Sequence, residues 1–248
     1  MARYDFRSPR LFVDQPLQPR GVVALDRAQA HYLRDVLRLV PGDGVLVFNG
    51  RDGEWHGTLE ANGKRALTVR LGVRTRPQEG GPDLHYLFAP LKRARLDYMV
   101  QKAVEMGVAR LAPVLTRHTQ AERVNAERMR ANAIEAAEQC GVLRLPEIAP
   151  PIALGDALAA LAPGRVLIFC DEDAPIADPV AALAAVAGAS ALAVLVGPEG
   201  GFAEEERAML LARHNIVRLA LGPRILRADT AAVAALALVQ AVLGDWRG

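Results

Sequence analysis

The amino-acid sequence predicts an α/β protein with a mainly parallel sheet, preceded by a small β-rich domain. The first 72 residues hold short strand-like segments separated by close turns, which is typical of a small barrel. A segment rich in proline and glycine, 76–83, then leads into a longer region where strands alternate with helices. We therefore predict a β-barrel domain at 1–72, a linker at 73–83 and an α/β domain at 84–248.

The hydrophobic pattern of the first domain predicts one short helix among strands. Residues 28–40 predict an amphipathic helix, because Leu33, Val36, Leu37 and Val40 would share one face. Turns are predicted at Pro41–Gly44, Asn49-Gly50 and Asn62-Gly63. Strands are predicted at 21–26, 45–48, 54–61 and 66–72.

The second domain is predicted from alternating apolar runs and helix-end signals. Gly107 and Gly141 are placed to end two helices, and the pair Asp178-Pro179 is placed to begin one. Asp229 or Thr230 would cap the last helix. Strands are predicted at 84–89, 108–115, 165–172, 191–197 and 216–222, and helices at 95–106, 125–140, from 179, at 202–214 and at 230–243.

The composition excludes several classes of protein. The two cysteines, Cys140 and Cys170, are far apart, which suits a reducing cytoplasm and excludes a disulfide scaffold. The five histidines lack metal-ligand spacing, so we expect no metal. No apolar run is long enough to cross a bilayer, so we expect a cytoplasmic protein with no membrane partner. The net charge of +2 is too small to indicate nucleic acid by itself, although the positive excess lies in residues 1–72.

A glycine-rich loop follows the predicted strand 191–197. The last residues of this strand are Val196 and Gly197, and Gly197 is also the first residue of the loop. Ligands of open α/β sheets lie beyond the carboxyl ends of strands, where glycines let the backbone approach closely. A tight turn before a helix is an equally weighted alternative. The acids Glu199 and Glu204–Glu206 disfavour a phosphate at this helix start, and they favour a cationic or zwitterionic ligand such as S-adenosylmethionine. The loop consists of Gly197, Pro198, Glu199, Gly200 and Gly201.

A second loop, after the strand 216–222, has a similar character. Leu221 and Gly222 end the strand, and Ile225 and Leu226 would supply apolar walls to a ligand. The two loops can form one pocket if their strands are neighbours. The sequence contains no phosphate-binding glycine motif and only two serines, Ser8 and Ser190, so a serine hydrolase is disfavoured.

The segments VGPEGGFAEEE and LGPRILRADTA together resemble the RsmE family of SPOUT methyltransferases. The stretches LDYMVQKAVEMGVARLAPVLTRHT, AIEAAEQCGVLRLPEI, HYLRDVLRLVPGD and FNGRDGEW agree in the same order. The resemblance implies a PUA-like RNA-binding barrel and a second domain whose C-terminal part forms a trefoil knot. It also implies S-adenosylmethionine as cofactor, methylation of N3 of a uridine in 16S ribosomal RNA of the small subunit, and a homodimer.

The chain departs from the family pattern at two positions. Asp229 stands where the family usually has Glu, and Val142 stands where an Arg is common. The final helix is a candidate for the dimer interface, with a plain core helix as the alternative.

Two loop residues are candidates for catalysis of N3 methylation. Arg227 would stabilise the negative charge of the deprotonated ring, and Glu199 would orient the base or accept its proton. The alternatives are a helix-end or phosphate-binding role for Arg227 and a loop-bracing role for Glu199. His118, beside Arg117 after a strand, could also lie near the site, although a surface or structural residue is the simpler reading.

Clustered cations are candidates for RNA contacts, because phosphate binding needs positive charge at the surface. For each one singly, a solvated surface residue is the alternative reading. A catalytically silent RNA-binding protein, a methyltransferase acting on another RNA and a nucleotide-dependent enzyme remain alternative functions. The candidates are Arg3, Arg7, Arg10, Lys92, Arg93, Arg95 and Arg117.

Overall fold

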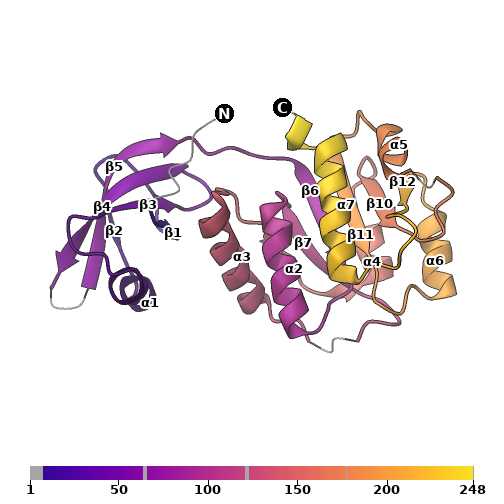
Figure 1. The fold of residues 1–248 in the computed structure, drawn as a ribbon, viewed down its shortest axis with the longest axis horizontal. Helices are drawn as coiled ribbons and strands as arrows, with labels where there is room; N and C mark the ends of the chain where they lie inside the picture. The colour runs from indigo at the N-terminus through magenta and orange to yellow at the C-terminus, as the bar shows by residue number, and fades with distance from the viewer. Residues whose placement is uncertain (1–7, 64–65, 121–122, 177, 248) are drawn as a thin grey trace. The chain divides into compact units, whose positions relative to one another are not determined.

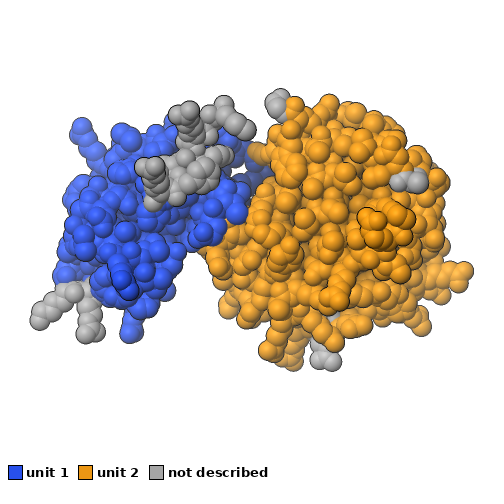
Figure 2. Space-filling model, viewed as in Figure 1, with its two compact units in different colours: residues 1–80, 137–145 blue, residues 81–136, 146–248 orange. Residues whose placement is uncertain are grey.

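The computed structural model describes residues 8–63, 66–120, 123–176 and 178–247. The chain forms two compact units, shown in blue and orange in Figure 2. Unit 1 comprises residues 1–80 and 137–145, and unit 2 comprises residues 81–136 and 146–248. The predicted boundaries at 72 and 83 stay predictions.

Unit 1 is built on a five-stranded sheet in the order β1-β3-β4-β5-β2, in which β1 pairs parallel with β3 and the other pairs are antiparallel (Figure 1). Its core is one cluster of buried side chains that includes Leu33, Val47, Trp55 and Val69. The elements are β1 Arg10–Phe12, β2 Val22–Ala24, α1 Arg27–His31, η1 Tyr32–Val36, β3 Gly44–Phe48, β4 Glu54–Asn62 and β5 Ala66–Arg76.

The predicted helix at 28–40 is wrong in its length and its buried face. The α-helix α1 continues as the π-helix η1, which ends at Val36. A π-turn has more residues than an α-turn, so the 3.6-residue period is lost. Leu33 is fully buried, whereas Val36 and Val40 are 58% and 59% exposed and Leu37 is 36% exposed.

Unit 2 contains a parallel sheet, and this confirms the α/β class. The strand order is β12-β10-β11-β6-β7-β8, with β9 pairing separately with β7, and every recorded pair is parallel. The carboxyl ends of these strands therefore lie at one edge. The elements are β6 Asp83–Phe88, α2 Arg93–Glu105, β7 Arg110–Leu115, β8 Glu147–Ile148, β9 Ile152–Ala153, α4 Leu154–Ala159, β10 Val166–Cys170, α5 Pro179–Ala184, β11 Ala191–Val196, α6 Glu204–Leu211, β12 Ile216–Leu219, α7 Ala228–Val242 and η2 Asp245–Arg247; α3, Ala126–Cys140, has residues in both units.

Helices cover both faces of this sheet, as the apolar strand sequences require. On one face, Leu87, Phe169 and Leu195 of the sheet pack in a cluster with side chains of α4 and α6. On the other face, the hydroxyl of Tyr86 lies 3.0 Å from the sulfur of Met99 in α2, and α7 packs against α2, α5 and β11. Figure 1 shows α2 and α7 side by side.

Most predicted helix ends are confirmed, and one is wrong. Gly107 and Gly141 follow α2 and α3 with φ of 73° and 72°, which glycine adopts freely. Asp178 caps α5 by accepting the N–H groups of Val180 and Ala181. The last helix, however, begins at Ala228 after Arg227, and Asp229 lies inside its first turn, where it accepts the N–H of Thr230.

No helix in the described part of the chain is long and apolar enough to span a membrane. The trefoil knot that the resemblance implies stays a prediction.

Candidate cofactor site and nucleic-acid interface

The first glycine-rich loop leaves β11 at the carboxyl edge of the sheet, as predicted. Val196 and Pro198 are buried, and Gly201 closes the turn by donating its N–H to the carbonyl of Pro198 at 3.0 Å. A Cβ at position 197 would lie 2.5 Å from the ring of Phe202, so any larger residue there would have to displace this ring. Gly201 has φ of 71°, which also favours glycine. The backbone of this loop is therefore specified by its sequence.

Glu199 is held by an ion pair at the surface of the loop. Its carboxylate accepts a hydrogen bond from Arg95 of α2 at 3.2 Å, and both side chains are about two-fifths exposed. α2 follows β6, the strand beside β11, so the pair joins the ends of neighbouring strands. The structure thus brings together a predicted catalytic residue and a predicted RNA contact.

A third segment, Thr116–Gln120 after β7, completes this side of the site. Nδ1 of His118 lies 3.1 Å from the carbonyl oxygens of Gly200 and of Gly201. Glu206 of α6 accepts the backbone N–H groups of Arg117 and Ala203, which ties the segment to the start of the helix. The sequence raised His118 as a residue near the site, but it did not indicate the contact with the loop, because that contact joins residues 82 positions apart.

The second loop follows β12. The two strands that precede the loops are not neighbours, as a shared pocket was expected to need, because β10 lies between β11 and β12. Gly222 has φ of 92°, Leu221 and Leu226 are partly buried, and Ile225 is 96% exposed. Ile225 therefore does not form an apolar wall in the protein alone. A common pocket of the two loops stays a prediction.

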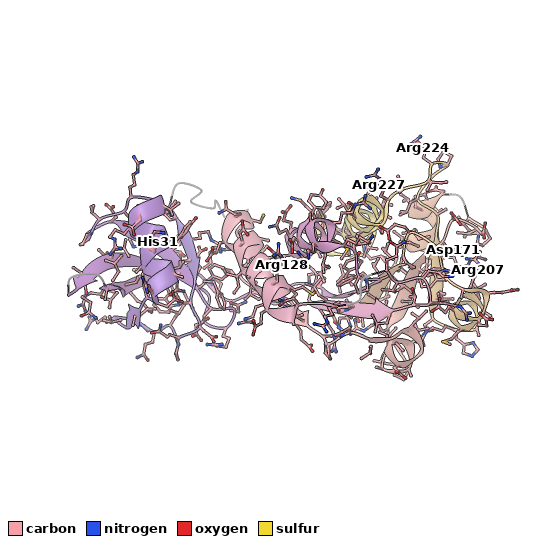
Figure 3. All side chains as sticks on the ribbon, turned by 90° about the horizontal axis from the view of Figure 1, so that it is seen from below. His31, Arg128, Asp171, Arg207, Arg224 and Arg227 are labelled. Atoms are coloured by element: carbon pink, nitrogen blue, oxygen red, sulfur yellow. The ribbon has the colours of Figure 1, made fainter. Side chains whose placement is uncertain are left out.

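The helix α7 brings the end of the second loop back to the middle of the sheet. Burial is the main cause that raises the pKa of the fully buried Tyr86 well above the usual value, and Cys170 raises it further. Asp229, in the first turn of α7, contributes in the same direction. Arg227 is exposed at the helix start, with Arg224 on the loop before it (Figure 3). Among the described residues, the Arg227 guanidinium has no hydrogen-bond partner and is available to a ligand.

A buried carboxylate closes the end of β10, between the two loop-bearing strands. Asp171 is fully buried and accepts hydrogen bonds from Arg207 of α6 at 2.7 Å and from Arg218 of β12 at 2.5 Å. Burial is the largest influence on its pKa and raises it, but the hydrogen bonds from both guanidinium groups outweigh burial, so the pKa of Asp171 is lowered. Figure 3 shows Asp171 beside Arg207. The sequence did not predict this cluster.

The backbone and the carboxylates at the two loops fit a zwitterionic cofactor with a sulfonium. The Cβ direction of Gly201 and of Gly222 is open, with nothing within 4 Å, so both backbones can approach a ligand closely. Glu199 and Asp229 supply negative charge near the loops, which suits a cation better than a phosphate. No group of metal-ligating side chains occurs in the described ranges.

The predicted RNA contacts fall into three groups. Lys92 and Arg93 are exposed at the start of α2, near Arg95, and Arg117 is exposed after β7. Arg10 is instead a structural residue. Its side chain is only 9% exposed, and it binds Glu54 at 2.8 Å and the carbonyl of Glu138 at 3.0 Å. Arg3 and Arg7 lie outside the described residues.

The burial of Arg10 makes a prediction about stability. In Arg10→Ala, the carboxylate of Glu54 would be left buried without its closest partner, so we expect a loss of about 3 kcal/mol in the free energy of unfolding of unit 1. The matched control is Arg51→Ala, which removes an exposed pair with Asp14 and should cost less than about 1 kcal/mol. Urea denaturation measures both. Equal effects of the two substitutions would contradict the structural role of Arg10.

Two family models match the chain. The model described as an RNA methyltransferase domain matches residues 79–240, and the model described as an RNA methyltransferase PUA domain matches residues 25–72. The first alone covers more than half of the chain.

Curated relatives and solved structures agree with these matches. The ribosomal RNA small subunit methyltransferase E of Rickettsia conorii is 31% identical over 93% of this chain and 94% of its own length. The protein of the same name from Synechocystis is 31% identical over 90% of this chain and 74% of its own.

A methyltransferase of Legionella pneumophila, solved with bound S-adenosylmethionine, has a TM-score of 0.83 at 28% identity, covering 96% of this chain and 99% of its own. A small subunit methyltransferase E of Neisseria gonorrhoeae has a TM-score of 0.84 over 97% of this chain and all of its own; at 24% identity it supports the fold. The resemblance and the fold class are confirmed. The chain therefore belongs to the RNA methyltransferase family that includes the ribosomal RNA small subunit methyltransferase E proteins.

Proposed function

We propose that this chain transfers a methyl group from S-adenosylmethionine to N3 of a uridine in 16S ribosomal RNA. The observation that carries the proposal is the open, glycine-built loop at the carboxyl edge of a parallel sheet, in a chain of this family. The relatives' names support the small-subunit RNA as substrate, and the Legionella structure supports the cofactor. The uridine and its N3 position come from the family resemblance.

The residues that would hold the cofactor are those of the two loops. S-adenosylmethionine, when bound, supplies an electrophilic methyl group on a positively charged sulfur. The loop backbones would bind its polar groups, and Leu226 and the exposed Ile225 would gain an apolar partner. The cofactor-binding set is Val196, Gly197, Pro198, Glu199, Gly200, Gly201, Leu221, Gly222, Ile225 and Leu226.

Gly222 provides a test of this cofactor site. An added Cβ meets nothing within 4 Å in the protein alone, so Gly222→Ala should fold with only the strain of its positive φ. With a cofactor against this backbone, the methyl group should lower the affinity for S-adenosylmethionine on the order of tenfold. Gly42→Ala is the matched control, because Gly42 has φ of 104° and equally open space, but lies in unit 1. Calorimetric titration measures both, and equal affinities would contradict the site.

The reaction requires a nucleophilic ring nitrogen, so N3 must lose its proton. Arg227, exposed and without a partner among the described residues, would stabilise the negative charge that spreads onto the ring oxygens. Glu199 would orient the base or accept its proton, and the ion pair with Arg95 fixes the direction of its carboxylate.

The RNA would contact the exposed cations Lys92, Arg93 and Arg117 and the partly exposed Arg95, as well as the PUA-like domain. The homodimer stays a proposal. Much of α7 is buried within its own unit, including Ala235, Leu236 and Val239, which supports a core role for that face. The cytoplasmic location stays a prediction.

The direct test of the proposed reaction uses purified protein, labelled S-adenosylmethionine and small ribosomal subunits from a strain that lacks the gene. We expect label in the 16S RNA of these subunits, and we expect binding of S-adenosylmethionine but not of ATP. If the protein bound S-adenosylmethionine but transferred no methyl group to RNA, this would instead indicate a catalytically silent RNA-binding protein.

A further inference from the structure

An open cleft lies beside the first glycine-rich loop. It has a volume of about 450 Å³, and its lining consists of Arg117, His118, Thr119, Gln120 and Gly200. The side chains that line it carry a guanidinium, an imidazole, a hydroxyl and an amide. No carboxylate occurs in this lining among the described residues. The cleft therefore presents hydrogen-bond donors and positive charge beside the loop of the proposed cofactor site.

The hydrogen bonds of His118 leave one ring nitrogen for a ligand. Both neighbours of Nδ1 are carbonyl oxygens, of Gly200 and Gly201, and carbonyls only accept, so Nδ1 must carry the proton. The other nitrogen, Nε2, has no hydrogen-bond partner among the described residues. Protonation of the ring would occur at Nε2 and would turn His118 into a second donor toward the cleft.

The charged groups around His118 are already engaged, with one exception. Glu206 of α6 accepts the N–H groups of Arg117 and Ala203, and Glu199 pairs with Arg95 of α2. Thr119 is bonded to Thr116 across the turn. The guanidinium of Arg117 is exposed and has no partner among the described residues. The guanidinium of Arg117 and Nε2 of His118 thus belong to adjacent residues and are both without a partner among the described residues.

We propose that this cleft binds a phosphodiester of the RNA substrate, held by Arg117 and by the protonated ring of His118. The proposal rests on the proposed function, because it names the part of the RNA that meets this site. A planar guanidinium and an imidazolium are suited to phosphate oxygens. Through Nδ1, the same imidazole touches the loop of the cofactor site, so one side chain positions the RNA backbone beside that loop.

The site makes RNA binding dependent on pH. A phosphate favours the charged form of an imidazole, so binding should be stronger in mildly acidic than in mildly alkaline solution. Because this binding needs no cofactor, it can be measured on the protein alone.

The test compares three forms of the full-length protein: wild type, His118→Asn and His214→Asn. The amide nitrogen of Asn can occupy the place of Nδ1 and keep the bonds to the loop, while Nε2 is lost. His214 is the matched control, because it is exposed and lies just before β12, an outer strand that β10, β11 and β6 separate from β7. A short uridine-containing ribo-oligonucleotide is titrated without cofactor at about pH 6 and at about pH 8.

We expect His118→Asn to weaken binding at the lower pH on the order of fivefold and to remove most of its pH dependence. The slope of log affinity against log salt should fall by about 0.7, the value for one contact to single-stranded nucleic acid. The ring resonances of His118 should shift when the oligonucleotide is added. The His214 variant should behave like the wild type, and affinity for S-adenosylmethionine should be kept in all three.

Three results would overturn the inference while leaving the proposed function in place. One is an unchanged affinity and pH dependence in His118→Asn, with methyl transfer intact. Another is a shift of the His118 resonances by uridine without any phosphate, which would make the cleft a base pocket. The third is a shift by inorganic phosphate alone with no effect of RNA. Failure of the wild type to bind RNA or to transfer methyl groups would refute the proposed function itself.

Discussion

Replacing Arg227 with Ala should lower kcat by about a hundredfold or more while leaving the affinity for S-adenosylmethionine nearly unchanged. Removing one preorganised donor from a developing negative charge typically has this effect on the rate. The structure favours such a role, because the guanidinium is exposed at the start of α7 and has no partner among the described residues. Single-turnover methylation of ribosomal RNA measures the rate, and calorimetry measures the cofactor affinity.

The Lys variant separates charge from geometry at this position. Arg227→Lys keeps the charge but loses the planar pair of donors, so its rate should lie between those of the wild type and of the Ala variant. A fall in cofactor affinity equal to the fall in rate would assign Arg227 to cofactor binding instead. The helix should form in all three proteins, because Arg227 caps α7 without a side-chain hydrogen bond.

Asp171→Asn should lower the free energy of unfolding of unit 2 by about 3 kcal/mol, which for a domain of this size is a fall of roughly 6 to 12 °C in Tm. The carboxylate is fully buried, and it forms ion pairs with both Arg207 and Arg218. The variant would leave two partly buried guanidinium groups facing a neutral amide. Thermal denaturation followed by circular dichroism measures the difference.

The pH dependence of stability provides a second readout for Asp171. Its pKa is lowered in the folded protein, so its contribution is present above the unfolded-state value of about 3.9 and is lost as the pH falls through the lower folded value. The difference in stability between wild type and variant should therefore shrink in strong acid. Glu147→Gln, which removes an exposed pair with Arg110, should change stability by less than about 1 kcal/mol. A difference between wild type and Asp171→Asn that stays constant with pH would contradict the account.

The periodicity of the sequence predicted the second domain well, because its strands are buried on both faces and its helices end at clear signals. Gly107, Gly141 and Asp178 act locally, through φ or through a cap, so the sequence around them is sufficient. The helix at 28–40 was mispredicted because a π-helix changes the period without a local signal. The start of α7 was misplaced because Asp229 bonds its neighbour and does not act as the cap.

The candidate site was predictable where the backbone itself forms it and not where distant segments meet. A close aromatic ring favours glycine at 197, and a positive φ favours glycine at 201. The loop sequence has glycine at both positions, so it indicates this backbone locally. The contacts of His118 with Gly200, and of Arg95 with Glu199, depend on the order of strands in the sheet. The burial of Arg10 likewise depends on residues 137–145 belonging to unit 1, which no local pattern indicates.

The measurement that tests the central claim most directly is mass spectrometry of nucleosides from small-subunit ribosomal RNA, in cells with and without this gene. We predict that 3-methyluridine disappears in the deletion strain and returns when its subunits are treated with the purified protein and S-adenosylmethionine. An unchanged amount of 3-methyluridine in the deletion strain would contradict the proposed substrate.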